Sequence, residues 1–202
     1  MKKVLITGWY GTETAGDKAI LGEIVFQLKK HNPKIKIFLT SIDIRLSWCT
    51  RDEMELDIDY IDINDSVNFL KNNNFCSLIF GGGPLMDSSK IKIIHNLFKV
   101  SNEKQMTNVI YGCGVGPIKL RKNKKLISSI LKLSDIAFFR DNISQKLAID
   151  LGLNKKKSFQ ACDPALNYVL RYKQKSDDSL KTNFDKIPIL IRKTTKEYGN
   201  GL

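Results

Sequence analysis

Histidine and cysteine, the residues that most often hold metal ions, are scarce and scattered in this sequence. There are two histidines, His31 and His95, and four cysteines, none in the CxxC spacing of zinc or redox sites. We therefore expect no metal site. His95 interrupts an apolar helical run and His31 follows two lysines at a helix end, so neither predicts acid–base catalysis. Three of the cysteines adjoin apolar runs, where we expect buried side chains; this usage suits a reducing cytoplasm.

The sequence also lacks a long hydrophobic segment. No run approaches the roughly 20 apolar residues of a membrane span. Val4–Thr7, which follows the basic start of the chain, is too short for the apolar core of a signal peptide. We expect a cytoplasmic protein that contacts the inner face of the membrane at most peripherally.

Acidic residues are few compared with basic ones. The chain has 33 Lys and Arg against 21 Asp and Glu, a formal net charge of +12. Such an excess favours polyanionic partners, namely nucleic acid, an anionic membrane surface or phosphorylated substrates. The lysines are scattered, however, and the clusters at 122–125 and 155–157 read as solvated helix ends or loops. No aromatic residues interleave with them to stack on bases, so we expect no nucleic-acid partner.

Short apolar runs alternate with segments of helical periodicity along most of the chain. This alternation predicts an α/β fold with a doubly wound, mostly parallel, Rossmann-like sheet. The predicted strands are Val4–Thr7, Ile35–Leu39, Ile58–Ile63, Leu78–Phe80, Asn108–Tyr111, Ile136–Phe139 and Ser158–Cys162. The predicted helices are Asp17–Lys30, one beginning near Ser41 or Asp43, Val67–Asn73, Ile91–Val100, Leu126–Leu133, and one that starts at Asp141 or Asn142 and stops at Gly152.

The pattern weakens in the last thirty or so residues. We expect a Rossmann-like domain over residues 1–172 and a polar linker over 173–186. Residues 187–202 would then begin a second domain that is otherwise missing, because the apolar run Ile187–Ile191 is followed only by a polar tail. An extra strand on the first domain is the alternative for that run.

Glycine-rich turns follow three of the predicted strands. In doubly wound sheets, ligands bind at the carboxyl ends of the strands, where glycine lets the backbone approach a ligand and helix N-termini attract anions. The alternative for each turn is a plain packing requirement. The candidate ligand-binding residues of these turns are Gly8, Gly11, Thr14 and Gly16 in the first, Gly81, Gly82 and Gly83 in the second, and Gly114 and Gly116 in the third.

Charged residues follow two later strands. Arg140 ends the predicted strand Ile136–Phe139, where its guanidinium could bind a carboxylate or phosphate through two hydrogen bonds. Asp141 follows it, and Asp163 precedes Pro164 at the end of the next strand. The structural alternatives are an Arg140–Asp141 pair, Asp141 as a helix N-cap, and Asp163 as a cap with proline in the first helical turn.

These motifs, in this order, resemble those of the polysaccharide pyruvyl transferase family. The matching segments are GWYGTETAGDKAIL (8–21), GGGPLMD (81–87), GVGP (114–117), RDNIS (140–144) and DPA (163–165). The sequence departs from the family pattern in three places. Thr14 stands where asparagine is usual, the triple-glycine turn is a residue shorter, and Cys113 stands where glutamine is common.

The resemblance implies one Rossmann-like half of a two-domain glycosyltransferase-B type fold. It implies transfer of a pyruvyl ketal from phosphoenolpyruvate, without a cofactor, to a hexose of a cell-surface glycan or its lipid-linked precursor. Arg140 matches the position implicated in binding phosphoenolpyruvate, and Asp17 matches a first-loop aspartate with an acceptor-binding or base role. The family's catalytic histidine comes from the second half, so we expect this chain alone to have little or no activity.

Two other functions fit the same residues. One is a sugar-nucleotide glycosyltransferase of the same architecture, which would release a nucleoside diphosphate instead of phosphate. The other is a non-catalytic module that binds an anionic ligand, another subunit or an anionic membrane. An NAD-dependent oxidoreductase is disfavoured, because the GxGxxG pattern is absent. The sequence predicts neither the acceptor sugar nor the oligomeric state.

Overall fold

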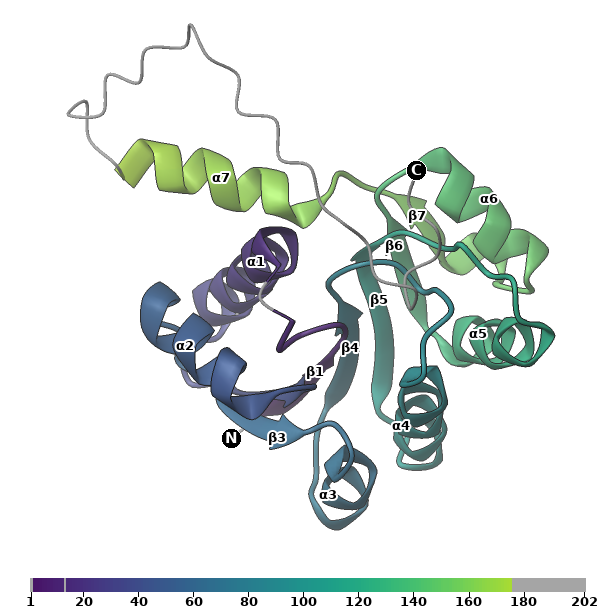
Figure 1. Ribbon diagram of the computed structural model, residues 1–202, viewed down its shortest axis with the longest axis horizontal. Helices are drawn as coiled ribbons and strands as arrows, with labels where there is room; N and C mark the ends of the chain where they lie inside the picture. The colour runs from purple at the N-terminus through teal and green to yellow at the C-terminus, as the bar shows by residue number, and fades with distance from the viewer. Residues whose placement is uncertain (1, 13, 176–202) are drawn as a thin grey trace, which may run out of the picture.

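The computed structural model describes residues 2–12 and 14–175, with side chains up to Arg171. Its strands form one parallel sheet in the order β3-β2-β1-β4-β5-β6-β7 (Figure 1). The strands are β1 (Lys3–Thr7), β2 (Lys36–Ser41), β3 (Asp59–Asp62), β4 (Ser77–Gly81), β5 (Thr107–Cys113), β6 (Ile136–Phe139) and β7 (Ser158–Gln160). The chain reverses its direction of progress between β1 and β4, which is the switch point of a doubly wound sheet. The predicted fold class is confirmed.

Helices cover both faces of the sheet, as right-handed crossovers between parallel strands require. They are α1 (Ala15–His31), α2 (Ile44–Met54), α3 (Ser66–Asn72), α4 (Ile91–Glu103), α5 (Arg121–Leu133), α6 (Asn142–Asp150), a 3-10 turn (Lys155–Lys157) and α7 (Pro164–Lys175). Each predicted helix is present with shifted ends. Asp43 and Asp141 accept hydrogen bonds from the first turns of α2 and α6, which is why those helices begin there.

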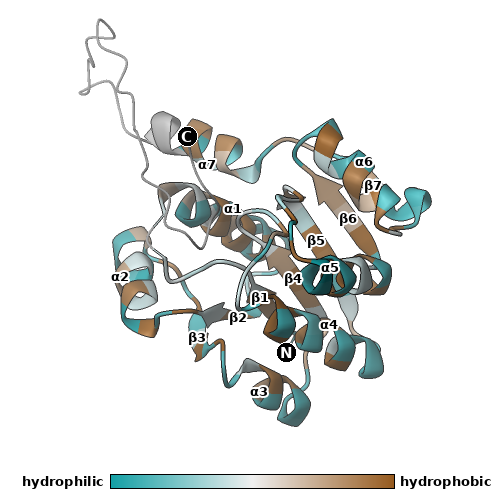
Figure 2. Cartoon of the chain, turned by 45° about the vertical axis from the view of Figure 1, so that its right-hand side comes forward, coloured by the Kyte–Doolittle hydropathy of each residue, from teal (hydrophilic) through white to brown (hydrophobic). Residues whose placement is uncertain are grey.

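The two faces of the sheet bury separate hydrophobic clusters. Along β1, Val4 and Ile6 belong to the cluster under α1, whereas Leu5 belongs to the cluster under α4 and α5. Successive side chains of a strand point to opposite faces, so a strand covered on both sides must be apolar throughout. Figure 2 shows the apolar strands between helices whose outer surfaces are hydrophilic.

The helix α7 runs away from β7, the strand that precedes it, and lies against α1 (Figure 1). A Cβ on Gly22 would lie 2.5 Å from the ring of Tyr168, so glycine permits the close approach of the two helices. Arg171 stacks on Phe26, 3.6 Å from the ring centroid, and pairs with the fully buried carboxylate of Glu23. α7 continues to Lys175, into the segment predicted as a linker; the rest of that segment and Ile187–Ile191 lie outside the described residues.

The cysteines differ from the expectation. Cys113 is buried at the end of β5, but Cys49, Cys76 and Cys162 are exposed. The prediction of three buried cysteines is therefore wrong. Cys76 immediately precedes β4 and Cys162 lies just beyond β7, where the chain leaves the covered part of the sheet.

Among the residues that the structure describes, no helix combines the length and apolar character that crossing a membrane demands. In the same part of the chain, no group of three or more His, Cys, Asp or Glu side chains could hold a metal ion.

Candidate active site

The carboxyl edge of the sheet brings together turns from β1, β4, β5, β6 and β7. We call this edge the rim. All strands are parallel, so their carboxyl ends lie at the same edge, and the five matching motifs meet there. Hydrogen bonds between the turns, described below, join them into one connected structure.

The turns after β1 and β4 are in direct backbone contact. A Cβ on Gly8 would collide with the carbonyl oxygen of Gly81, so glycine is needed where the two strands end. Trp9 donates a hydrogen bond from Nε1 to the carbonyl oxygen of Pro84 at 2.6 Å, and its ring packs edge-on against Phe80. These contacts hold the triple-glycine turn against the first loop.

Tyr10 lies beneath the triple-glycine turn. Its ring is 2.8 Å from where a Cβ on Gly82 would be, and the residue is buried. Its hydroxyl finds no hydrogen-bond partner among the residues that the structure describes. Burial raises the pKa of this hydroxyl well above its ordinary value, and the negative charge of Asp17 adds to that effect. Tyr10 therefore stays protonated at neutral pH.

Asp17 lies in the first turn of α1, at the rim. Thr14 donates a hydrogen bond from Oγ1 to Asp17 Oδ2. Asp17 Oδ1 is 3.4 Å from where a Cβ on Gly83 would be. A Cβ on Gly16 would have none of the described heavy atoms within 4 Å, so the first turn of α1 borders open space. The N-terminus of a helix attracts anions through its free N–H groups and its dipole.

The turns after β4 and β5 are hydrogen-bonded to each other. Leu85 donates to the carbonyl oxygen of Gly114 at 2.9 Å, and Gly116 donates to that of Leu85 at 2.8 Å. Asp87 completes the connection. Its Oδ2 accepts from the backbone N–H groups of Lys119 (2.6 Å) and Leu120 (3.1 Å), and its Oδ1 accepts from Asn123 Nδ2 at 3.0 Å. Asp87 thus anchors the two residues that lead into α5 and has a structural role.

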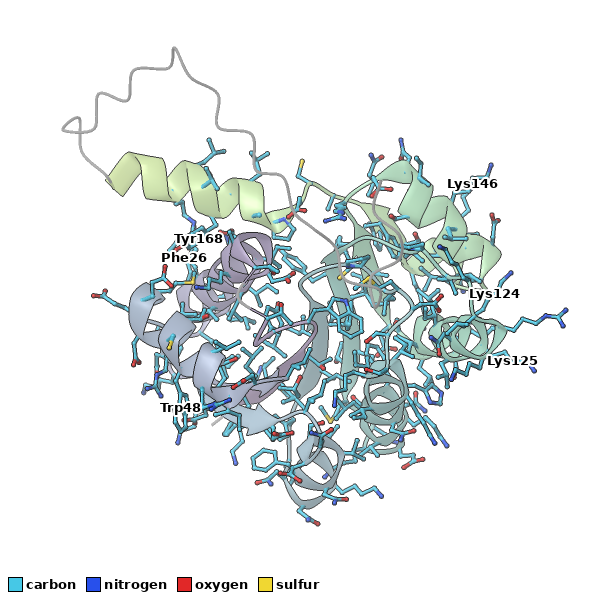
Figure 3. All side chains as sticks on the ribbon, in the orientation of Figure 1. Phe26, Trp48, Lys124, Lys125, Lys146 and Tyr168 are labelled. Atoms are coloured by element: carbon cyan, nitrogen blue, oxygen red, sulfur yellow. The ribbon has the colours of Figure 1, made fainter. Side chains whose placement is uncertain are left out.

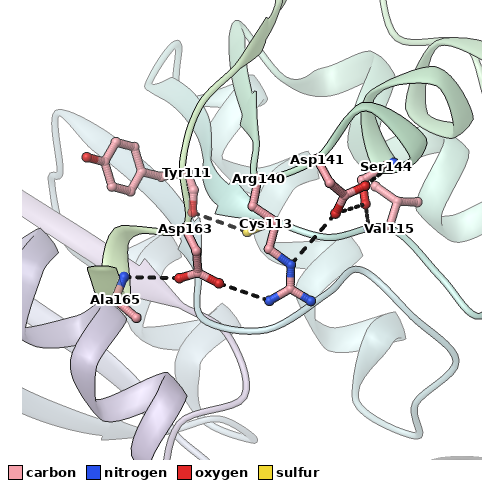
Figure 4. Close-up of polar contacts among 8 residues, drawn as sticks. All are labelled: Tyr111, Cys113, Val115, Arg140, Asp141, Ser144, Asp163 and Ala165. Atoms are coloured by element: carbon pink, nitrogen blue, oxygen red, sulfur yellow. Dashed lines mark hydrogen bonds and ion pairs between the residues drawn. The ribbon is translucent and has the colours of Figure 1, made fainter. Parts of the chain in front are cut away.

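Ser144 ties the turn after β5 to the start of α6 (Figure 4). Its Oγ accepts from the N–H of Val115 and donates to Asp141 Oδ2, each at 3.0 Å. Asp141 Oδ1 accepts from the N–H of Ser144 at 2.7 Å. That hydrogen bond lowers the pKa of Asp141, and the nearby charge of Arg140 lowers it further. The capping role weighed for Asp141 is therefore real.

Arg140 lies between two carboxylates (Figure 4). Its Nη1 donates to Asp163 Oδ2 at 3.1 Å, and its Nε is 3.8 Å from Asp141 Oδ2. The side chain remains 37% exposed, so the pairing does not bury it. A Cβ on Gly114 would lie 3.2 Å from Nη2 and 3.3 Å from Nε, so glycine leaves room for the guanidinium. Asp163 Oδ1 also accepts from the N–H of Ala165 at the start of α7.

A buried thiol lies close to these groups. Cys113 donates hydrogen bonds from Sγ to the carbonyl oxygens of Tyr111 (3.3 Å) and Phe80 (3.5 Å). Burial raises the pKa of the thiol far above its ordinary value; the charge of Arg140 opposes the shift and that of Asp163 adds to it. The thiol therefore stays protonated and is a poor nucleophile.

The structure gathers most, but not all, of the predicted site residues in one place. Those gathered along the rim are Gly8, Thr14, Gly16, Asp17, Gly81, Gly82, Gly83, Gly114, Arg140, Asp141 and Asp163. Gly11 instead lies against Ser41 and Asp43 beyond β2, and Gly116 lies beside Leu147 of α6. The sequence-based selection omitted Trp9, Tyr10, Asp87 and Ser144, although all four belong to the matching motifs.

Beside the first loop lies a small cavity of about 10 Å³, lined by Tyr10, Thr14, Asp17 and side chains of α2 and β3. A cavity of that volume holds about one water molecule. A substrate-sized ligand would therefore lie on the open rim and not inside this wall of the domain.

Several solved structures with a similar fold are UDP-N-acetylglucosamine 2-epimerases or complexes with UDP. The UDP-GlcNAc 2-epimerase from Neisseria meningitidis, bound to UDP-GlcNAc, matches with a TM-score of 0.63 and 12% identity, over 87% of this chain and 50% of that one. The UDP-N-acetylglucosamine 2-epimerase from Rickettsia bellii matches with 0.60 and 14%, over 88% and 50%. Anabaena Alr3699/HepE in complex with UDP matches with 0.54 and 10%, over 81% and 44%.

At these identities the likeness shows the fold alone, that of one half of a glycosyltransferase-B type enzyme. The chain spans about half the length of the structures that it matches. No curated protein sequence matches it. The family model for polysaccharide pyruvyl transferases, however, matches residues 15–200. Because that match spans most of the sequence, the chain belongs to the polysaccharide pyruvyl transferase family.

Proposed function

We propose that this chain supplies one wall of the active site of an enzyme that transfers a pyruvyl ketal from phosphoenolpyruvate to a hexose. The acceptor would belong to a cell-surface glycan or its lipid-linked precursor, and no cofactor would be needed. The observation that carries the proposal is the meeting of Asp17, the triple-glycine turn and Arg140 at one rim in a chain of this family.

The reaction demands an electrophilic C2 in the enolpyruvyl group. A proton is added to the methylene carbon, and C2 then accepts one hydroxyl of the sugar. Loss of phosphate and attack by the second hydroxyl close the ketal. The two sugar hydroxyls lose one proton each. One of these protons makes up for the proton added to the methylene carbon, and the other leaves with the phosphate as hydrogen phosphate. The enzyme must therefore bind two anionic groups of the donor and hold two hydroxyls in place.

Arg140 is our candidate for binding the donor's carboxylate or phosphate. Asp141 and Asp163 hold its Nε and Nη1, and Nη2 lies beside Gly114. Two carboxylates around one guanidinium leave this cluster without an excess of positive charge, so Arg140 cannot attract the donor by charge alone. We propose that the open first turn of α1, at Gly16, provides the second anion-binding element. Asp17, between them, would bind or deprotonate an acceptor hydroxyl.

Calorimetric titration of the chain with phosphoenolpyruvate tests the proposal. We expect saturable binding that Arg140→Gln weakens at least about tenfold, because a charge-assisted pair of hydrogen bonds is lost. Arg51→Gln is the matched control, since Arg51 is an exposed arginine of α2 paired only with its neighbour Asp52 among the described residues. Its binding constant should match that of the unmodified chain.

The alternative glycosyltransferase is tested with the same preparation. Titration with UDP and a UDP-sugar should give no binding that depends on Arg140. Tight binding of either, with phosphoenolpyruvate ignored, would overturn the proposal. In an enzyme that contains both walls of the active site, phosphate release with a hexose acceptor marks pyruvyl transfer, whereas UDP release marks glycosyl transfer.

A further inference from the structure

A strongly basic surface lies on α5, one of the helices that cover the sheet. The helix α5 carries Arg121, Lys122, Lys124, Lys125 and Lys132 and has no acidic residue. All five are exposed, while Asn123, Ile127, Ile130 and Leu131 on the opposite side are buried. We call these five residues the α5 basic face. Figure 3 shows Lys124 and Lys125 pointing away from the sheet, with Lys146 of α6 projecting on the same side of the molecule.

The charge of this face is not neutralised within the part of the chain that the structure describes. None of the five side chains lies within ion-pair distance of a described carboxylate. Elsewhere lysines do find partners, such as Lys18 with Glu53 and Lys157 with Asp135. Five unpaired like charges on one helix repel one another, so an anionic partner would relieve that repulsion.

The surface around these residues is hollowed. A shallow depression of about 910 Å³ runs between α5 and the end of α6, and all five residues of the α5 basic face line it. The acidic residue in that lining is Asp150. The stem of Lys132 lies over Gly152, where a Cβ would be 2.6 Å from its Cε. The depression is thus wide, open and predominantly positive.

Two aliphatic side chains are exposed close to the same helices. Leu120 immediately precedes α5 and is 50% exposed, and Ile143 in the first turn of α6 is 80% exposed. Because both helices follow strands of a parallel sheet, their N-terminal ends lie at the rim. Basic side chains beside exposed aliphatic ones are typical of surfaces that rest on anionic lipid headgroups and insert apolar groups among the acyl chains.

We propose that the α5 basic face, with Leu120 and Ile143, docks the protein on an anionic membrane surface. Nucleic acid fits these residues less well, because they include no aromatic ring on which a base could stack. The docking would place the rim at the membrane, which suits a lipid-linked acceptor; only this last consequence rests on the proposed function. The docking itself involves neither Arg140 nor Asp17.

Vesicle co-sedimentation of the full chain tests the proposal. We expect binding to phosphatidylcholine vesicles that contain about 30 mol% phosphatidylglycerol and not to phosphatidylcholine alone. Raising the salt from about 0.05 M to about 0.5 M should release the protein, because the attraction is screened. Absence of a preference for anionic vesicles would overturn the proposal.

Two charge variants locate the surface. The patch variant carries Lys122→Gln, Lys124→Gln, Lys125→Gln and Lys132→Gln, which preserve helix propensity. The control variant removes the same charge from α1, β2, the turn between them and α3 through Lys30→Gln, Lys34→Gln, Lys36→Gln and Lys71→Gln, all exposed. The patch variant should bind anionic vesicles at least about 100-fold more weakly, and the control at most about threefold. Equal losses would show a general charge effect and overturn the assignment.

Two further experiments separate apolar insertion from electrostatic attraction, and a membrane partner from nucleic acid. The Leu120→Ser, Ile143→Ser double variant should bind about tenfold more weakly while keeping its salt dependence, because only apolar insertion is lost. Unchanged binding would overturn the insertion. A DNA duplex that competes with vesicles and binds the patch residues more tightly would identify nucleic acid as the partner and overturn the proposal. If the patch variant has a lowered melting temperature, Lys124→Gln with Lys125→Gln alone serves the same comparison.

Discussion

The guanidinium of Arg140 reaches Asp163, with Nη1 3.1 Å from Oδ2, and this pair spans the ends of two neighbouring strands. The other oxygen of the same carboxylate accepts from Ala165 at the start of α7. α7 in turn packs along α1, whose first turn carries Asp17. Arg140 and Asp17, the two candidate catalytic residues, are therefore connected through the packing of α7 on α1 as well as across the rim.

Asp163→Asn tests whether Arg140 binds the donor. Asparagine keeps an oxygen that can accept from Ala165, so the cap of α7 persists, but the negative charge beside the guanidinium is removed. We expect the affinity for phosphoenolpyruvate to rise about threefold to tenfold in calorimetric titration. Asp163→Ala, which also removes the cap, should lower the melting temperature without a further gain. An Asp163→Asn variant with weaker binding would mean that the carboxylate is needed to position the guanidinium of Arg140.

Gly16→Ala tests the anion-binding role proposed for the first turn of α1. The new methyl group would meet no described atom within 4 Å, and alanine is the better helix former, so we expect stability to rise by about 0.5 kcal/mol. The same methyl group would obstruct an anion that approaches the helix N-terminus, so binding of phosphoenolpyruvate should weaken about fivefold. Denaturation and titration of one sample give both values. A stabilised variant with unchanged affinity would exclude this helix end from the site.

Local signals in the sequence predicted most elements of this domain. Asp141 caps the start of α6, as its carboxylate before a helical run predicts. Gly152 follows the end of α6 and has a φ of +105°, a conformation that favours glycine. The parallel arrangement followed from apolar strands alternating with helices. Because parallel strands end at one edge of the sheet, the sequence alone indicates that the motifs after these strands lie together at that edge.

Features that depend on distant partners could not be predicted in this way. α7 reads as polar, with Leu166, Val169 and Leu170 exposed, and its packing partner α1 is far away in the sequence. The pairing of Arg140 with Asp163 depends on the order of β6 and β7 in the sheet. No periodicity or spacing in the sequence carries that information.

Asp87→Ala tests the link between the turns after β4 and β5. The substitution removes the acceptor of three hydrogen bonds, two of them from the backbone of the residues just before α5. We expect a loss of about 1–2 kcal/mol, or roughly 2–8 °C in melting temperature for a chain of this size. Asp65→Ala is the control, because Asp65 precedes α3 without capping it through its side chain among the described residues. A change of the same size in both variants would refute the stabilising role of the Asp87 hydrogen bonds.

The lowered pKa of Asp141 predicts a pH-dependent contribution to stability. A carboxyl whose pKa is lower in the folded chain stabilises it above the unfolded value, about 3.9, and loses that effect as the pH falls through the folded value. Urea denaturation should find Asp141→Asn less stable than the unmodified chain at pH 7, by under about 1 kcal/mol because the group is 44% exposed. The difference should shrink towards zero as the pH is lowered through the folded-state pKa of Asp141, where the stabilising effect is lost. A constant difference across this range would contradict the assignment.

The pair of Glu23 and Arg171 offers the strongest test of how α7 is held. Glu23 is fully buried and also accepts from Gln27 Nε2 at 2.7 Å, whereas the Arg171 side chain is 26% exposed. Arg171→Ala would leave a buried carboxylate without its cation, which costs about 3 kcal/mol, or roughly 6–12 °C.

Removing both charges with Glu23→Leu and Arg171→Leu should restore stability to within about 1 kcal/mol of the unmodified chain, because neither group then lacks its partner. Chemical denaturation of the single and double variants measures how strongly Glu23 and Arg171 depend on each other. A double variant no more stable than Arg171→Ala would contradict the proposed pairing. Since α7 begins at the carboxylate that holds Arg140, Arg171→Ala should also weaken binding of phosphoenolpyruvate, and the double variant should recover it.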